Sequence, residues 1–252
     1  MTLNNSIPER TDKPIPDRYV NMSNALARSA QGLSLSEKRI ISLGLAKTDS
    51  LPFFDAAKYQ NTGFSIKLTA AEYAESYDVS AVTAYEQIKD GANVLMKREV
   101  RTLEQGRKGL IEKRMNWLSG VIYHHGEGWA EIHFTHFVTP HLLGLRSKFT
   151  SYKLKQASAL RSIYAWRLFE CLQSWADKGV WSPTVDVFNH AMETPESCLH
   201  NFGMMRRRVI EPALKELREK DNMLIEVELK KSGRKVTDLI FKFSKNPQSK
   251  LF

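Results

Sequence analysis

The sequence predicts an α+β protein built from two winged-helix domains in tandem. Three observations lead to this fold class. The order helix, strand, helix, turn, helix and hairpin can be traced twice along the chain, as in a helix-turn-helix with a β-ribbon wing. The 252 residues suit two domains with separate cores, and 42% of them are hydrophobic. The predicted division is a mobile tail 1–18, a first domain 19–146, a second domain 147–245 and a C-terminal tail 246–252.

The first domain is expected to contain four helices, with one short strand between the second and the third, followed by three further strands. Ser36 is suited to cap the second helix, and Thr69 to cap the helix AAEYAESY. A basic turn, EQGRKGLIEKR, should join the first two strands that follow the helix 80–98. In chain order, the predicted elements are helices 20–30 and 37–46, strand 64–68, helices 70–77 and 80–98, and strands 100–103, 115–123 and 129–134.

The second domain repeats this order of elements. A hairpin should end it, turned by Lys231, Ser232 and Gly233. The repetition is one of element order and not of residues, so it indicates duplication of a fold rather than a particular function. The predicted elements are helix 159–175, strand 181–185, helices 186–192 and 202–220, and hairpin arms 223–230 and 235–243.

The helix 202–220 is amphipathic. At ~100° per residue, its apolar arc consists of Phe202, Met205, Val209, Ile210, Ala213, Leu214 and Leu217. The opposite side presents Met204, Arg207, Arg208, Glu211, Lys215 and Arg218. Pro212 has no N–H to donate, so we expect it to kink the helix or to separate its first turns from the rest.

The arginine triplet in this helix is the main candidate for DNA recognition. The planar fork of arginine can bond O6 and N7 of guanine together, so Arg207 and Arg208 are the candidate base contacts. Arg206 falls by angle within the apolar arc, and is assigned to phosphate or to structure. A basic triplet can also be a solvated face. Its place in the first turns of a third helix, with Asn201 as a cap, favours DNA contact.

Other cations are candidates for phosphate contacts. The hairpin tip KKSGRK has four cations in six residues, which favours a phosphate-gripping wing over an ordinary charged turn; they are Lys230, Lys231, Arg234 and Lys235. Lys38 and Arg39, near a helix start, could hold phosphates. In the helix 80–98, the outward Thr83, Lys89 and Asn93 are candidate base contacts, with a solvated face as an equal alternative. The turn with Arg107, Lys108, Lys113 and Arg114 would be the wing of the first domain.

Charge and composition narrow the function classes. The net charge of +9 favours a polyanionic partner, either nucleic acid or an anionic membrane surface. The C-terminal half carries most of the excess, with 19 basic and 12 acidic residues in 147–252 against 18 and 16 in 1–146. Cys171 and Cys198 have no metal-site spacing, which fits a reducing cytoplasm. Neither a membrane span nor a signal peptide is evident, so we expect a cytoplasmic protein.

Enzymatic motifs are mostly missing from the sequence. There is no GxxxxGK[ST], which disfavours a P-loop ATPase or helicase. The histidines His124, His125, His133 and His136 could suggest a metal-dependent strand-nicking enzyme. Such enzymes place two histidines on either side of one bulky apolar residue, whereas HFTH spaces them by three. We therefore expect a protein that is not an enzyme and has no metal or other cofactor.

Several segments resemble the iteron-binding plasmid replication initiators, the Rep_3 or initiator RepB family. LSLSEKRIISLGL resembles the first-domain helix of that family, and LTAAEYAESYDVSAVTAYEQIKDGANVL resembles its helix-turn-helix. FTSYKLKQASALRSIYAWRLFECLQSW is similar to the linker and the first helix of its second domain. FGMMRRRVIEPALKEL, with the hairpin containing SGRKVTDLIFKF, resembles its recognition helix and wing. The resemblance covers about residues 19–243, in matching order and spacing.

The resemblance implies a protein that binds direct repeats at a plasmid origin as a monomer, helps to open an A·T-rich stretch and loads host initiator and helicase proteins. It also implies a homodimer, formed through the first domain and dissociated with the help of chaperones, that represses its own promoter at an inverted repeat. By motif match, Arg206, Arg207 and Arg208 contact bases and phosphates, and Lys38 and Arg39 contact the DNA backbone.

Three alternatives stay open on the sequence alone. A winged-helix transcriptional repressor without initiation activity would not need direct repeats beside its gene. A strand-nicking replication enzyme would need a metal and a catalytic tyrosine. A structural nucleoid protein would bind random DNA about as well as origin repeats.

Overall fold

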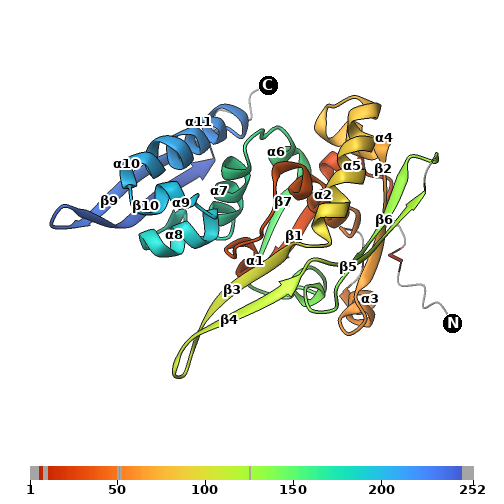
Figure 1. The fold of residues 1–252 in the computed structure, drawn as a ribbon, viewed down its shortest axis with the longest axis horizontal. Helices are drawn as coiled ribbons and strands as arrows, with labels where there is room; N and C mark the ends of the chain where they lie inside the picture. Colours follow the sequence, from red (N-terminus) through yellow and green to blue (C-terminus); the bar gives the residue numbers. More distant parts are fainter. Residues whose placement is uncertain (1–5, 8–10, 50, 52, 125, 246–252) are drawn as a thin grey trace.

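The computed structural model describes residues 6–7, 11–49, 51, 53–124 and 126–245. In these residues, two units of helices and strands lie side by side along the longest axis of the molecule (Figure 1). Each unit combines a helix-turn-helix with a three-stranded antiparallel sheet. The α+β class and the tandem of winged helices are confirmed.

The first unit is built around a helix that is buried on nearly all sides, α2 (Leu35–Lys47). Its N-cap is Ser34 and not the predicted Ser36. The hydroxyl of Ser34 accepts from the Glu37 N–H, and the Glu37 carboxylate accepts from the Ser34 N–H, which forms a capping box. The other main elements are β1 (Tyr19–Ser23), α1 (Asn24–Ala27), α3 (Phe53–Ala56), β2 (Phe64–Thr69), α4 (Ala70–Tyr77), α5 (Ala81–Leu95), β3 (Glu99–Gly106), β4 (Gly109–Asn116), β5 (Leu118–His124), β6 (Trp129–Phe134) and β7 (Phe149–Lys153).

The helix-turn-helix of this unit is formed by α4 and α5. As predicted, Thr69 caps α4. Ser80 caps α5, because its side chain accepts a hydrogen bond from the Thr83 N–H. The turn between them contains Asp78 in the left-handed region at φ 51°. Gly91 lets α5 approach α2 closely, because a Cβ there would lie 2.5 Å from Cδ1 of Ile40. The residues of α5 that face the core are buried, among them Ala84, Ile88, Ala92 and Leu95.

The second unit follows the same plan. Its first helix packs on the third helix and on the second, and a two-stranded ribbon ends the unit. The elements are α6 (Leu154–Ser158), α7 (Ile163–Gln173), β8 (Val180–Trp181), α8 (Val185–Met192), α9 (Glu196–Leu199), α10 (Phe202–Met205), the π-helical η4 (Arg206–Ile210), α11 (Glu211–Lys220), β9 (Met223–Ser232) and β10 (Lys235–Lys245). Short 3-10 turns elsewhere are η1 (Ile15–Asp17), η2 (Ala57–Tyr59) and η3 (Thr139–His141).

The two sheets correspond strand for strand. The strand orders are β2-β6-β5 in the first unit and β8-β10-β9 in the second, so in each the last strand lies in the middle. The wing of the first unit is therefore the β5–β6 hairpin. The predicted wing, the basic turn, belongs instead to the β3–β4 hairpin, a separate two-stranded sheet between α5 and β5 (Figure 1). The assignment of the basic turn to the wing was wrong, because both hairpins follow the third helix and have similar strand patterns.

The N-terminal prediction also needs correction. Residues 19–23 form β1, which pairs antiparallel with β7, so the predicted helix 20–30 is reduced to the single turn α1. The predicted mobile tail is ordered over residues 11–18: Ile15 is buried, and Nε of Arg18 donates to the Lys13 carbonyl at 2.7 Å. Residues 1–5, 8–10 and 246–252 lie outside the described residues.

A continuous hydrophobic core runs through both units. It includes Leu45 and Ile132 of the first unit, Trp166 and Phe169 of α7, and Leu217 of α11. None of the helices in the described part of the chain has the length and hydropathy that crossing a bilayer demands.

Candidate nucleic-acid interface

The third helix of the second unit runs through α10, η4 and α11. Its first turn is capped by Asn201, whose Oδ1 accepts from the Met204 N–H at 3.0 Å. The predicted apolar arc faces the core: Phe202 is half-buried, and the other six residues are buried. The hydrophobic pattern therefore correctly predicted which face of this helix is free to contact a ligand.

The three arginines occupy a π-helical turn. Pro212 cannot donate to the carbonyl of residue 208, and the chain responds with the π turn η4 directly before α11. We predicted a kink or a break at this point, and the π turn is the form that it takes. All three arginines are exposed.

The arginines differ in their partners. Nε of Arg206 donates to Oε1 of Glu211 at 2.8 Å. Arg206 was assigned from the sequence to phosphate or to structure, and this ion pair is its contact within the protein. Within the described residues, the side chains of Arg207 and Arg208 form no hydrogen bond or ion pair, so their guanidinium groups are free to bind a ligand. Lys215 is exposed and lies 3.9 Å from Oε1 of Glu219, a weak contact that an anion could replace.

The wing of the second unit approaches the start of this helix. A groove of about 930 Å³ lies between them, with Lys231, Arg234 and Lys235 on one wall and Phe202 and Met205 at its base. The structure thus brings together two stretches that the sequence analysis singled out separately. All three wing cations are exposed, at the tip of the β9–β10 ladder.

The same groove is also lined by residues at the start of α8 that were not singled out from the sequence. These are Thr184, the N-cap of α8, and Asp186 in the first turn. The Thr184 hydroxyl accepts from the Val187 N–H at 3.2 Å. The available signal was the capping pattern itself, since helix starts with free N–H groups attract phosphates.

The candidate residues of the first unit lie on the outer side of α5. Lys89 and Asn93 are exposed, and Thr83 is half-buried with its hydroxyl 2.8 Å from that of Ser80. Nothing in the structure tests their contact with DNA, so this role stays a prediction. In the β3–β4 hairpin, Lys113 pairs with Glu104 at 2.8 Å and Arg114 pairs with Glu99, which leaves Arg107 and Lys108 as the exposed cations of its turn.

Lys38 and Arg39 do not lie on a DNA-accessible surface, and their assignment to phosphates was wrong. Lys38 is completely buried, with its Nζ 2.6 Å from Oε1 of Glu170. Burial lowers the pKa of Lys38 to about 8, while Glu170 opposes the shift. Arg39 is 5% exposed, and its guanidinium lies 5.1 Å from the centre of the Tyr77 ring. The physical reason is that α2 is a central helix, so its charged residues face the protein interior.

The histidines do not form a metal centre in the described part of the chain. His124 stacks on Trp129 with ring centroids 3.4 Å apart, and His133 lies 3.8 Å from the Glu131 carboxylate. His125 lies outside the described residues. Among the described residues, no three His, Cys, Asp or Glu side chains gather as a metal site would require.

Two winged helices in tandem, with free arginines on a third helix beside a basic wing, define a DNA-binding protein of the winged-helix class. Residues 19–173 match the family described as initiator replication protein, WH1, and residues 184–243 match initiator Rep protein, WH2. The chain belongs to this family of replication initiators.

The chain is also similar to three other proteins. An uncharacterised 27.6 kDa protein of Escherichia coli is 28% identical over 231 residues, which are 88% of this chain and 94% of that protein. The Pi initiator protein, solved in complex with iteron DNA, has the same fold, with a TM-score of 0.72 at 18% identity over 92% of this chain and 99% of its own. The WH1 domain of MSBI1.176, a replication protein isolated from a multiple sclerosis patient, is 26% identical over 42% of this chain and 76% of its own, with a TM-score of 0.33.

Proposed function

We propose that this protein initiates plasmid replication by binding, as a monomer, to directly repeated double-stranded sites at the origin. The observation that carries the proposal is the pair of free arginines, Arg207 and Arg208, on the third helix of the second winged helix. Membership of the initiator family supports it, as does the fold shared with an initiator that was solved on iteron DNA.

The proposal assigns different roles to different cations. Arg207 and Arg208 read base edges in the major groove, because each can form a forked pair with guanine. Arg206, Lys215 and the wing residues Lys231, Arg234 and Lys235 contact phosphates on either side, which positions the helix without reading sequence. In the first domain, α5 provides auxiliary contacts through Thr83, Lys89 and Asn93.

The proposal contains no catalytic step. Binding energy is used to hold the origin repeats and to favour opening of an adjacent A·T-rich stretch, where host initiator and helicase proteins are then loaded. The protein acts in the bacterial cytoplasm, where its plasmid lies. Incubation with supercoiled origin DNA should leave the circles intact, whereas a strand-nicking enzyme would convert them to nicked circles.

A second state of the protein fits the β3–β4 hairpin. This hairpin carries apolar side chains that face solvent, with exposed fractions of 45% for Leu103, 70% for Leu110 and 48% for Ile111. Leu103 and Leu110 lie on one face of this two-stranded ladder, and Ile111 lies on the other. Apolar side chains exposed together on one face are typical of protein interfaces. We propose that they contribute to a homodimer, which binds an inverted repeat in the protein's own promoter, represses it and is dissociated by chaperones. Leu110→Lys should shift the protein towards monomer in analytical ultracentrifugation.

The experiment that tests initiation is a footprint on the DNA that flanks the gene, followed by binding titrations. We expect protection of a set of direct repeats, and affinity for one repeat about 10³-fold or more above that for a scrambled duplex. Binding should weaken steeply with salt, because several phosphates are neutralised. Equal affinity for both duplexes would point to a structural nucleoid protein, and protection of an inverted repeat alone would point to a repressor.

A further inference from the structure

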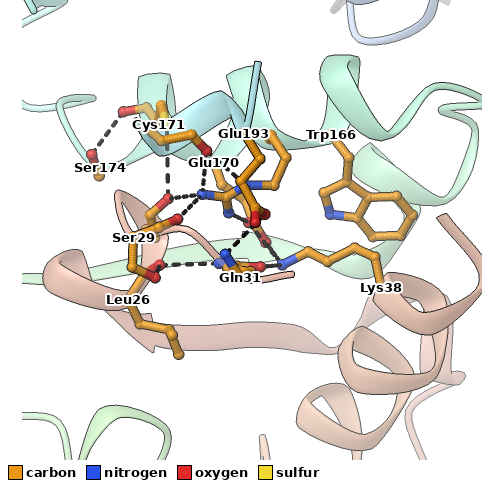
Figure 2. Close-up of polar contacts among 12 residues, drawn as sticks. Leu26, Ser29, Gln31, Lys38, Trp166, Glu170, Cys171, Ser174 and Glu193 are labelled. Atoms are coloured by element: carbon orange, nitrogen blue, oxygen red, sulfur yellow. Dashed lines mark hydrogen bonds and ion pairs between the residues drawn. The ribbon is translucent and has the colours of Figure 1, made fainter. Parts of the chain in front are cut away.

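A buried ion pair joins the two winged helices. Lys38 lies on α2 of the first, and Glu170 lies on α7, the first helix of the second. Nζ of Lys38 is 2.6 Å from Oε1 of Glu170, and both side chains are completely buried. The amide oxygen of Gln31 accepts a further hydrogen bond from the same Nζ at 2.8 Å (Figure 2).

Arg167, also on α7, extends this contact. Its Nη1 donates to Oε2 of Glu170 at 2.9 Å. Its Nη2 donates to the carbonyls of Ala27 in α1 and Ala191 in α8, at 3.2 and 2.9 Å. One guanidinium group therefore ties together a carboxylate, the first unit and the second helix of the second unit.

Glu193 makes a third connection at the rim. It caps the end of α8 in the left-handed conformation, at φ 49°. Its Oε2 accepts from the main-chain N–H groups of Gln31 and Gly32, at 3.0 and 2.8 Å. We call these five residues the interdomain polar network: Gln31, Lys38, Arg167, Glu170 and Glu193.

A separate contact links the two helix-turn-helices directly. Glu216 on α11 accepts from the main-chain N–H groups of Arg161 and Ser162 at the start of α7. The Arg161 guanidinium reaches across to the carbonyl of Tyr77, at the end of α4, at 3.4 Å. The helix that carries the free arginines is thereby connected to the end of α4, one turn before α5.

Such contacts fix an orientation more strictly than apolar packing does. Apolar surfaces can slide over each other at small cost, but a displaced buried charge loses its partner and stays desolvated. The network contains one lysine, one arginine and two carboxylates whose partners lie on the other unit or at its boundary. The two third helices, α5 and α10–α11, are therefore held at one separation and angle.

We infer that the interdomain polar network holds the two third helices so rigidly that the protein binds tightly only when the two halves of its DNA site have one fixed spacing. This inference rests on the proposed function, in which α5 and α10–α11 contact the same site. Inserting one base pair moves one half by about 3.4 Å and turns it by about 35°, which a rigid pair of readers cannot follow. The network residues touch no DNA and act by positioning the helices that do.

The test uses the full-length protein and the footprinted site. A cysteine is introduced by Glu86→Cys on α5 or by Glu219→Cys on α11, and an iron chelate attached to it cleaves the DNA nearby, which maps where each helix lies. Cys171 and Cys198 are buried and should not be labelled. Duplexes with one or two base pairs inserted between the two mapped segments are then titrated. The proteins compared are the wild type, the double variant Lys38→Met/Glu170→Gln, the rim variant Glu193→Ala and the control Lys58→Met/Asp55→Asn.

Wild-type protein and the control, which loses an ion pair within the first unit, should bind the inserted duplexes at least about tenfold more weakly than the native site. Network variants that fold should bind the inserted duplexes no more than about threefold more weakly than the native site. If the double variant does not fold, Glu193→Ala at the rim serves as the test. Equal sensitivity of wild type and variants, or tolerance by the wild type, would overturn the inference and leave the proposed function standing. Cleavage from the α11 probe alone would contradict the role of α5 and the inference with it.

Discussion

Arg206 and Glu211 form an ion pair across the π turn, with Nε of the arginine 2.8 Å from Oε1 of the glutamate. The pair distinguishes Arg206 from the two arginines that follow it. A guanidinium already committed to a carboxylate gains less from a base, because the existing contact must be given up. Arg207 and Arg208 have no such competitor within the described residues.

Replacing the free arginines should lower sequence discrimination. Arg207→Ala and Arg208→Ala should each lose about 1–3 kcal/mol of the difference between the repeat and a scrambled duplex, if each reads a base. Fluorescence anisotropy titrations on both duplexes measure this difference. Arg206→Ala is the matched control, and it should weaken binding to both duplexes about equally. Equal losses on both duplexes for all three variants would move the whole triplet to phosphate contacts.

Replacing a wing cation should change the salt dependence and not the specificity. Lys235→Ala removes one exposed charge from the wall of the groove, so the slope of log K against log salt should become shallower by about one. Binding titrations between low and physiological salt measure the slope. Lys58→Ala, which removes an exposed lysine from η2, should leave the slope unchanged. An unchanged slope for Lys235→Ala would exclude the wing from the interface.

Removing one partner of the buried Lys38–Glu170 pair should lower the free energy of unfolding more than replacing both partners. Lys38→Met leaves the Glu170 carboxylate buried without its lysine partner, so the free energy of unfolding should fall by about 3 kcal/mol or more. Lys38→Met/Glu170→Gln should recover part of that loss. Urea denaturation of the single variants and the double variant measures the coupling. Additive losses would show that the two groups do not stabilise each other.

Asp221 provides a prediction about pH. It follows α11, and burial raises the pKa of its carboxyl to about 6, while Lys245 opposes the shift. The pKa of this carboxyl in the folded protein lies above the ordinary 3.8, so its protonation stabilises the folded protein, and this contribution is complete below about pH 4. It is lost as the pH rises through 6.

Asp221→Asn should therefore stabilise the protein at pH 7 by about 1–2 kcal/mol, once partial solvent exposure is allowed for. The gain should shrink between pH 6 and pH 4 and vanish below it, because the wild-type carboxyl is then neutral too. Urea denaturation at pH 3.5, 5 and 7 measures the trend. A stabilisation that did not change with pH would assign the effect to something other than this charge.

The elements that were predicted correctly depend on local signals. The cap Thr69 and the apolar arc of 202–220 follow from residues within a few turns of each other, and both agree with the structure. The free face of the recognition helix was predictable for the same reason.

The errors concern partners that are distant in sequence. β1 is a strand because it pairs with residues about 130 positions further on, which no local pattern reveals. Lys38 lies on a helix with a charged first turn that is typical of an exposed helix, yet its partner Glu170 is 132 residues away. The β3–β4 hairpin was taken for a wing because strand patterns predict hairpins but not which sheet they join.

Methylation interference at the footprinted repeat is the most direct test of whether the second winged helix reads the major groove. Methyl groups on guanine N7 project into that groove, and those on adenine N3 project into the minor groove. We expect N7 methylation at one or two guanines to block binding of the wild type, and Arg207→Ala or Arg208→Ala to be insensitive at the guanine that its arginine reads. Interference at adenine N3 alone, or a pattern unchanged in both variants, would contradict the account.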